Sequence, residues 1–149
     1  MRIAVSTDEK TPLVDEIVED LKMRGHEVLY FGPGAEEASA DWPDVTLEAV
    51  NSVRSDAADE AIVMCWTGTG CSIAANKVPG IRAALCHDAE TARGARIWNH
   101  ANVLALSLRA TSPALAREIL DKWFETPFSD DEWNLRQIGR LQSLDEMRE

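Results

Sequence analysis

Residues 61–86 read AIVMCWTGTGCSIAANKVPGIRAALC, and this stretch decides the fold. Residues 61–64 are apolar and half of them are β-branched, which is typical of a buried strand. The Thr/Gly-rich residues 67–70 then predict a turn, and Ser72 can cap a short helix that follows it. A strand, a glycine turn and a helix in this order predict an active-site loop at the end of a strand.

Two glycines give the turn the means to hold an anion. Gly68 and Gly70 can adopt positive φ angles and let backbone N–H groups approach a ligand at a helix N-terminus. The turn lies beside the thiols of Cys65 and Cys71. It lacks the Gly-Lys-Ser/Thr ending of a P-loop, and two glycines do not complete a dinucleotide fingerprint. We therefore predict a site for an oxyanion or an anionic substrate and disfavour nucleotide binding.

Strands and helices alternate along the whole chain. The expected strands are 2–6, 27–31, 61–65, 82–86 and 103–106, and the expected longer helices are 12–24, 45–54, 89–97, 113–124 and 131–149. This order predicts an α/β fold, a Rossmann-like three-layer sandwich with a mostly parallel five-stranded sheet. At 149 residues and 45% hydrophobic content, we expect a single domain over 1–149.

Composition excludes several classes of function. A net charge of −11 disfavours a nucleic-acid or anionic-membrane surface, and no apolar run reaches the length of a membrane span. The N-terminus lacks the pattern of a signal peptide, so we expect a cytoplasmic protein. Three cysteines, an odd number, predict reduced thiols. Cys65 and Cys71 have no neighbouring His, so we expect no metal site.

A longer motif carries a resemblance to a known family. The phrase SIAANKVPGIRAALC, residues 72–86, is specific, and further matches spread over nearly the whole chain: Asp8, residues 41–44 (Asp-Trp-Pro-Asp), Asn99, residues 101–104 (Ala-Asn-Val-Leu) and Arg109. On these residues the chain resembles the type B ribose-5-phosphate isomerases and their galactose-6-phosphate isomerase relatives. The resemblance implies an aldose–ketose isomerase that acts on a sugar or sugar phosphate through a cis-enediolate, without a cofactor.

This chemistry assigns roles to the residues of the turn. Moving a carbonyl between two sugar carbons requires a base, an acid near the carbonyl oxygens and stabilisation of an enediolate. The resemblance implies that the base is a Cys at the position of Cys65 or, in another branch, a Glu at the position of Cys71. We favour Cys65, whose thiolate nearby N–H dipoles can stabilise, with Thr67 as proton donor or relay and the amides of residues 68–70 as the enediolate cradle. Cys71 either lines the pocket or is, like Cys86, a small buried apolar residue.

Our candidate site follows from the turn and the resemblance together. The catalytic candidates are Cys65, Thr67, Cys71 and Asn99, and the substrate-binding candidates are Asp8, Glu9, Trp42, Trp66, Gly68, Thr69, Gly70, Ser72, Trp98, Arg109, Trp133 and Arg136. We expect Asp8, Cys65, His87 and Asn99 at strand exits or in the loops after them. Asp88 is expected to cap the next helix, whereas His100 as a substitute acid is disfavoured, because adjacent side chains of an extended segment point in opposite directions.

Several positions depart from the family pattern. The usual Asp-His pair after the first strand reads Asp8-Glu9, which replaces a potential phosphate contact with an acid. The usual His-Asn pair, whose His opens the sugar ring, reads Trp98-Asn99. The Gly that usually follows the base is Trp66. These changes predict a substrate that differs from ribose 5-phosphate.

The C-terminal segment also departs from the family pattern. The family's Arg-His-x-x-Arg phosphate clamp reads Trp-Asn-Leu-Arg-Gln over 133–137, which leaves Arg136. Four tryptophans stand at or beside family site positions: Trp42, Trp66, Trp98 and Trp133. They either fill core or dimer-interface volume or reshape the pocket, and we favour a reshaped pocket. The substrate is then unphosphorylated or a short open chain, although Arg109 could still hold an anionic group.

The resemblance also implies a partner. The final segment is expected to form a helix that packs on a second subunit, with active sites at a dimer interface, in a homodimer or tetramer. Two alternatives are a hetero-oligomer that divides the site between related subunits and a sugar-binding homologue that has lost catalysis. Retention of Cys65, Thr67, Asn99 and Asp8 disfavours the loss of catalysis.

Overall fold

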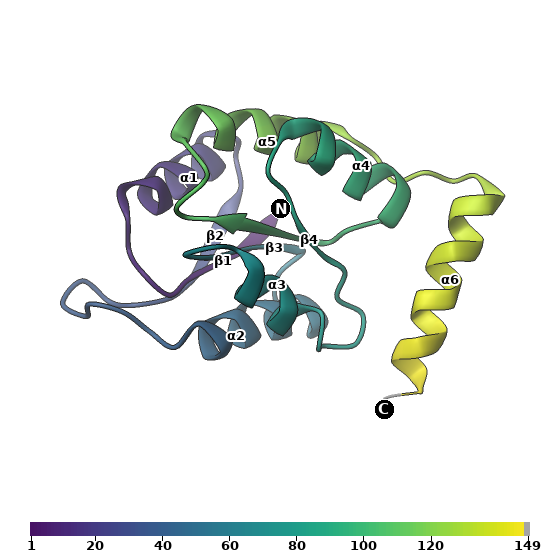
Figure 1. The fold of residues 1–149 in the computed structure, drawn as a ribbon, viewed down its shortest axis with the longest axis horizontal. Coiled ribbons are helices and arrows are strands. Elements are labelled where there is room, and N and C mark those ends of the chain that lie inside the picture. The colour runs from purple at the N-terminus through teal and green to yellow at the C-terminus, as the bar shows by residue number, and fades with distance from the viewer. Residues whose placement is uncertain (148–149) are drawn as a thin grey trace.

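The computed structural model describes residues 1–147, and within them five strands and six helices alternate (Figure 1). In chain order the elements are β1 (Arg2–Thr7), α1 (Pro12–Met23), β2 (Glu27–Phe31), α2 (Trp42–Arg54), β3 (Glu60–Cys65), α3 (Thr69–Ala75), β4 (Ala83–Leu85), α4 (Ala89–Asn99), β5 (Val103–Ser107), α5 (Pro113–Glu125) and α6 (Glu132–Glu146). The α/β fold expected from the sequence is confirmed.

The sheet has the strand order β2-β1-β3-β5-β4, and every pair is parallel. The register places Val5 opposite Ile62 and Ile62 opposite Leu104. Helices α1, α4 and α5 cover one face and α2 and α3 the other, which gives the expected Rossmann-like sandwich (Figure 1). Strand β2 lies on one side of β1, and the chain then crosses to the other side of β1 to form β3. The strand order therefore reverses between β1 and β3. Ligands bind at the carboxyl edge beside such a reversal.

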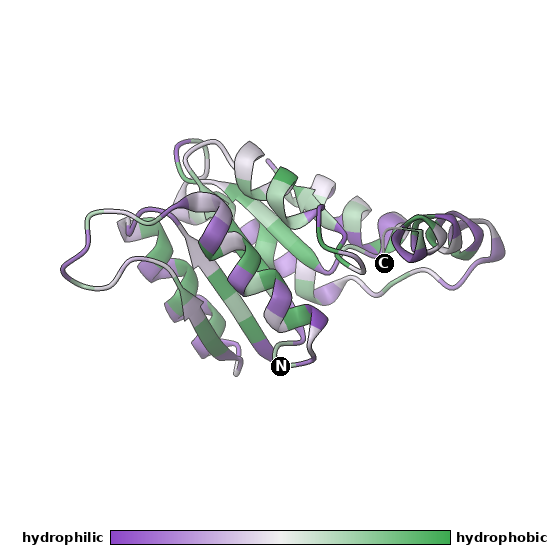
Figure 2. Cartoon of the chain, turned by 90° about the horizontal axis from the view of Figure 1, so that it is seen from below, coloured by the Kyte–Doolittle hydropathy of each residue, from purple (hydrophilic) through white to green (hydrophobic). Residues whose placement is uncertain are grey.

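Alternation along β3 builds two cores. Ile62 and Met64 belong to the cluster under α1, α4 and α5, whereas Ala61, Val63 and Cys65 belong to the cluster under α2 and α3. Successive side chains of a strand point to opposite faces, so a strand buried on both faces reads as a continuous apolar run. Figure 2 shows the apolar colouring concentrated in the sheet between the helices.

Most element boundaries lie within two residues of the sequence prediction, but the starts of α2 and α3 differ by three residues or more. Helix α2 begins at Trp42 rather than residue 45, because Pro43 fits the first helical turn. Helix α3 begins at Thr69 with Gly68 as its N-cap, so the expected capping role of Ser72 is wrong and Ser72 lies inside the helix. The left-handed conformation of Gly68, with φ +76°, turns the chain sharply enough to start the helix earlier than a Ser cap would.

Helix α6 projects from the side of the sandwich (Figures 1 and 2). Asp131 is its N-cap and accepts a hydrogen bond from the Asn134 amide at 3.0 Å, and near its other end the Asp145 carboxylate accepts one from the Gly80 amide at 2.9 Å. Its exposed side chains include Trp133, Leu135, Leu141 and Leu144. The predicted helix extended to residues 148–149, which lie outside the described residues. Among residues 1–147, no helix is long and apolar enough to cross a membrane.

Candidate active site

Asp8 and Cys65 meet at the carboxyl edge of the sheet. Thr7, the last residue of β1, pairs with Met64 of β3, so the residues that follow each of them lie side by side. Burial raises the pKa of Asp8, and the negative charge of the Cys65 thiolate raises it further. Asp8 Oδ1 is buried without a hydrogen-bond partner among the described residues. The structure thus places an unsatisfied carboxyl oxygen beside a reactive sulfur where the strand order reverses.

The Cys65 thiol is strongly acidic. Its pKa is lowered to about 5, mainly by the neighbouring Cys71 thiol and also by the backbone N–H groups of Cys71, Gly68 and Thr67, against the opposing effect of burial. N–H dipoles at the start of a helix stabilise a thiolate in this way. Cys65 is therefore a thiolate at neutral pH, as a carbon base requires.

Cys71 has the opposite character. The neighbouring Cys65 sulfur and burial raise the pKa of Cys71, and its side chain is 0% exposed. Its sulfur lies 3.2 Å from the carbonyl oxygen of Gly68 and 3.6 Å from that of Val63, both acceptors for its proton. Cys86 is also fully buried, and burial raises its pKa to about 12. Cys71 therefore keeps its proton and stays neutral next to the Cys65 thiolate.

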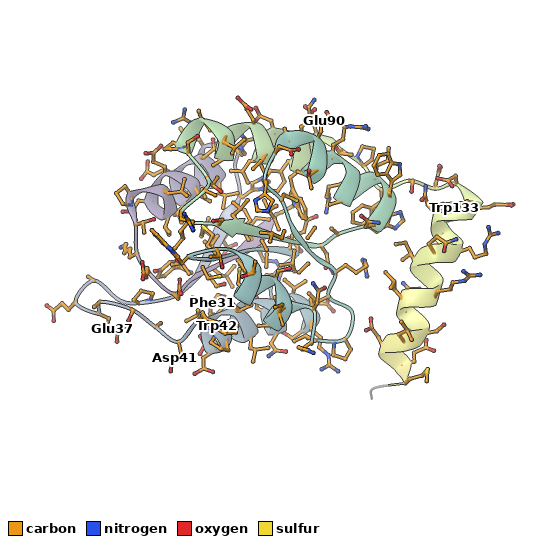
Figure 3. The ribbon with its side chains drawn as sticks, in the orientation of Figure 1. Phe31, Glu37, Asp41, Trp42, Glu90 and Trp133 are labelled. Carbon is orange, nitrogen blue, oxygen red and sulfur yellow. The ribbon has the colours of Figure 1, made fainter. Side chains whose placement is uncertain are left out.

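Close packing explains the two glycines of the turn. A Cβ on Gly68 would lie 2.6 Å from Cδ1 of Leu85 and 2.9 Å from the backbone of Leu106. A Cβ on Gly70 would lie 3.2 Å from the ring of Trp42, which stands at the start of α2 (Figure 3). The Trp42 ring thus forms one wall beside the turn, and the glycines let the backbone approach it and the sheet.

The hydroxyls and neighbouring loops complete the mouth of the site. The exposed hydroxyls of Thr67 and Thr69 are 2.7 Å apart. The carbonyl oxygen of Trp66 accepts hydrogen bonds from the Ser107 hydroxyl and the Arg109 amide, each at 3.0 Å. Trp66 and Arg109, both exposed, therefore lie beside the end of β3. Ser107 was not expected at the site, because its only signal in the sequence is a hydroxyl at the end of an apolar strand.

The side chain of Glu9 is exposed, and its carbonyl oxygen accepts a hydrogen bond from the Thr7 hydroxyl at 2.6 Å. It follows Asp8 at the same edge of the sheet. Asp88 caps α4 as predicted, because its Oδ1 accepts a hydrogen bond from the Thr91 amide at 2.7 Å. His87 is exposed after β4.

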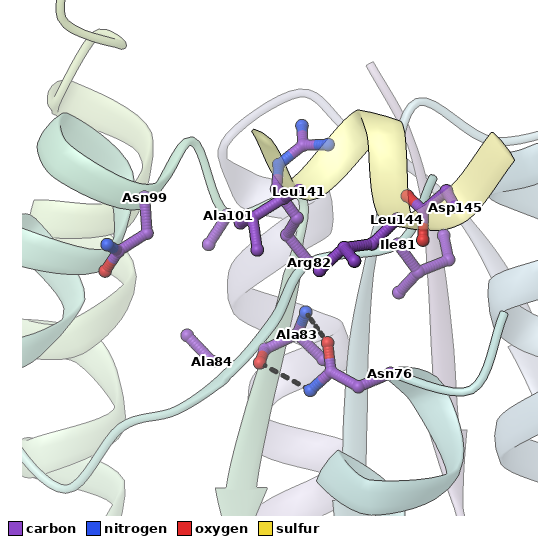
Figure 4. A pocket seen from close by; sticks show the side chains of 10 residues that line it. All are labelled: Asn76, Ile81, Arg82, Ala83, Ala84, Asn99, Ala101, Leu141, Leu144 and Asp145. Atoms are coloured by element: carbon purple, nitrogen blue, oxygen red, sulfur yellow. Dashed lines mark hydrogen bonds between the residues drawn. The ribbon is translucent and has the colours of Figure 1, made fainter. Parts of the chain in front are cut away.

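Asn99 lies at the other edge of the sheet, and its expected place near a strand exit is wrong. Helix α4 starts at the carboxyl edge after β4 and must return to the amino edge, because β5 runs parallel to β4. Asn99 is the last residue of that helix and lines a cavity together with Arg82 and Ala83, at the start of β4 (Figure 4). It cannot reach Cys65 of its own chain.

Three further candidates also lie away from the Cys65 site. Trp98 precedes Asn99 and packs against Gly94, where a Cβ would lie 2.9 Å from its ring, and it is 53% exposed. Trp133 and Arg136 are exposed on α6, and Figure 3 shows Trp133 on the opposite side of the molecule from Trp42. One chain therefore does not bring these side chains to its own turn.

The cavity beside Asn99 lies between α6 and the amino edge of the sheet. Its volume is about 380 Å3, and its walls include Leu141, Leu144 and Asp145 of α6 (Figure 4). On the opposite wall the Asn76 side chain exchanges two hydrogen bonds of 2.9 Å with the backbone of Ala83. His100, which follows Asn99, has a left-handed conformation, and its ring stacks on that of Phe128.

Solved structures and curated relatives agree with this architecture. The chain superposes on ribose-5-phosphate isomerase B of Clostridium thermocellum with a TM-score of 0.93 and 40% identity, covering 100% of both chains. It is 35% identical over 129 residues to D-erythrulose-4-phosphate isomerase of Pectobacterium atrosepticum, covering 86% of this chain and 85% of that protein. It is also 35% identical over 145 residues to galactose-6-phosphate isomerase subunit LacB of Clostridium acetobutylicum, covering 97% and 83%.

A sequence model described as Ribose/Galactose Isomerase matches residues 3–143, which is nearly the whole chain. The match includes the Cys65 turn, α4 and most of α6. The chain belongs to the Ribose/Galactose Isomerase family and is an aldose–ketose isomerase of the sugar phosphate isomerase type.

Proposed function

We propose that this isomerase uses Cys65 as its carbon base and acts on a sugar other than ribose 5-phosphate, within a single domain. The acidity of Cys65, whose pKa is about 5 in a ring of N–H donors, carries the proposal. A catalytically inactive sugar-binding homologue would have no use for this thiolate, so the same observation disfavours that alternative.

In the proposed mechanism the Cys65 thiolate removes a proton from the carbon beside the carbonyl and later returns it to the adjacent carbon. The Gly68 amide already donates to the carbonyl oxygen of Cys65 at 3.3 Å, so we assign the enediolate cradle to the N–H groups of Thr69 and Gly70. The Thr67 hydroxyl, which is hydrogen-bonded to the Thr69 hydroxyl, moves the proton between the two sugar oxygens. Asp8, whose pKa is raised by burial, lies beside Cys65 and hydrogen-bonds to a sugar hydroxyl.

The rest of the site comes from a second subunit in our proposal. The side chains of Trp98, Asn99, Trp133 and Arg136 are exposed and lie away from the turn of their own chain. The apolar side chains of α6 give a partner subunit a surface to cover. We propose a homodimer or tetramer in which these residues enter the partner's site. The LacB relative is named as a subunit, which keeps a hetero-oligomer as the second candidate.

For the substrate we propose a short sugar that stays open. Trp66 and Trp42 take up room beside the turn, and their faces suit the C–H side of a sugar. The relative named D-erythrulose-4-phosphate isomerase supports a four-carbon substrate. Arg109 and Arg136 remain as cations that can bind a terminal phosphate. We therefore propose a tetrose phosphate as the first candidate substrate and the free tetrose as the second.

Hydrogen exchange tests this proposal directly. Purified protein in deuterated water is incubated with phosphorylated and free tetroses, pentoses and hexoses, and exchange at the carbon beside the carbonyl is followed by NMR. We expect exchange with a tetrose phosphate or free tetrose, abolished in Cys65→Ala and retained at a reduced rate in Cys71→Ala. Rapid exchange with ribose 5-phosphate alone would refute the proposed substrate. Exchange that survives in Cys65→Ala would refute the proposed base.

A further inference from the structure

Two buried thiols belong to one packed cluster beneath the turn. Cys65 ends β3 and Cys71 is the third residue of α3, and the Cys71 sulfur lies 3.2 Å from the carbonyl oxygen of Gly68 and 3.6 Å from that of Val63, two residues before Cys65. A disulfide requires two cysteines whose sulfurs can approach without a large movement of the backbone. This pair is already held together by the fold.

The two thiols have complementary reactivity. The pKa of about 5 makes Cys65 a thiolate at neutral pH, which is the form that peroxides oxidise. Cys71 keeps its proton and lies in the same packed cluster as that sulfur, where a resolving thiol is needed. Cys86 is 0% exposed, and burial raises its pKa to about 12, so it provides a built-in unreactive comparison.

We propose that Cys65 and Cys71 form a peroxide-sensitive pair whose oxidation closes a reversible disulfide and stops isomerisation. In the first step the Cys65 sulfur attacks one oxygen of hydrogen peroxide, the O–O bond breaks, and Cys65 becomes a sulfenic acid while hydroxide leaves. In the second step the Cys71 sulfur attacks the Cys65 sulfur. The sulfenic hydroxyl leaves with the Cys71 proton as water, and the two electrons lost by the thiols have reduced the peroxide.

The same geometry makes the disulfide easy to reduce. A thiol of low pKa is a good leaving group, so a dithiol that attacks the Cys71 sulfur displaces the Cys65 thiolate readily. The N–H groups of residues 67, 68 and 71 then receive that thiolate again. Loss of turnover rests on the proposed role of Cys65 as the base, whereas formation of the disulfide does not.

Mass spectrometry tests the pair without reference to any sugar. The full chain is treated with hydrogen peroxide, unfolded in urea with N-ethylmaleimide so that every remaining thiol is blocked, digested and analysed for linked peptides. We expect a Cys65–Cys71 linkage that lacks two hydrogens, alkylated Cys86, and return of both thiols after treatment with dithiothreitol. Cys71→Ser should stop at the Cys65 sulfenic acid, which dimedone traps, and Cys86→Ser should behave as the wild type does. Cys71→Ala serves as a second variant if the serine variant does not fold.

Two results would overturn the proposal: a wild-type chain whose Cys65 proceeds to sulfinic acid without the linkage, or a linked chain that keeps its isomerase activity. A chain that forms the linkage on oxidation, but isomerises no sugar even before oxidation, would instead count against the function proposed above. The two failures are therefore distinguishable.

Discussion

Cys65 is reactive because of the donors around its sulfur, and this can be tested on the residue itself. Its rate of alkylation by iodoacetamide should follow the thiolate fraction, with a plateau at neutral pH and a fall as the pH drops through about 5. Mass spectrometry of the alkylated peptides measures the rate, with Cys86 as the control. A midpoint near the pKa of an ordinary thiol, about 8.5, would contradict the structure.

Cys71 makes the largest contribution to that acidity, so Cys71→Ala should shift the alkylation profile of Cys65 toward higher pH. Cys71→Ser keeps a hydroxyl donor at the same place and should shift the profile less. A profile that is unchanged in Cys71→Ala would mean that the N–H groups alone hold the thiolate. The matched pair of variants separates the hydrogen bond from the packing of the side chain.

Gly68 should tolerate no side chain. Its left-handed φ of +76° and the 2.6 Å approach of a Cβ to Leu85 together predict that Gly68→Ala destabilises the fold by about 2–4 kcal/mol. Gly25 has a similar φ of +84° but no atom within 4 Å of such a Cβ, so Gly25→Ala should cost only about 1 kcal/mol. Urea unfolding measures both. Equal costs would show that the backbone conformation, and not the clash, decides the effect at Gly68.

At the scale of elements, a buried ion pair joins β3 to α4. Glu60 accepts from Arg96 at 2.8 Å and from the Trp123 indole of α5 at 2.7 Å, and burial raises its pKa against the opposing effect of Arg96. Arg96→Met leaves a buried carboxylate and should cost about 3–5 kcal/mol at neutral pH. Without Arg96 the pKa of Glu60 rises further. The loss of stability should therefore shrink as the pH falls and Glu60 takes up a proton.

The double variant Glu60→Gln with Arg96→Met is the control for this prediction, because a neutral amide still accepts from Trp123. Urea titrations at neutral and mildly acidic pH should show a smaller and less pH-dependent loss for the double variant than for Arg96→Met. A loss of the same size and pH dependence in both would assign the effect to packing around the Arg96 side chain.

The sequence predicted the elements that local patterns determine. The apolar run of β3, the glycine turn and Asp88 as a cap are read from spacing alone, and the structure has each of them. Asn99 could not be placed in this way, because its position depends on the direction in which α4 crosses the sheet. The start of α3 depended on a positive φ at Gly68, which a Gly residue permits but does not require.

At the scale of the whole molecule, the proposed site is divided between two edges of the sheet. Cys65 lies at the carboxyl edge and Asn99 at the amino edge, and no rotation of side chains within one chain joins them. The exposed apolar side chains of α6 have the character of a surface that another subunit covers. A functional unit with both groups at one turn then requires a second chain.

Subunit complementation tests this arrangement. Cys65→Ala and Asn99→Ala should each be nearly inactive alone, because every site lacks one of the two groups. When the two are unfolded together and refolded as a mixture, half of the dimers should be mixed, and each mixed dimer has one site with an intact Cys65 and an intact Asn99. Activity should therefore return to about a quarter of the wild-type value. A mixture that stays inactive although mass spectrometry detects mixed dimers would show that the two residues do not act across the interface, and full activity of Asn99→Ala alone would remove Asn99 from the site.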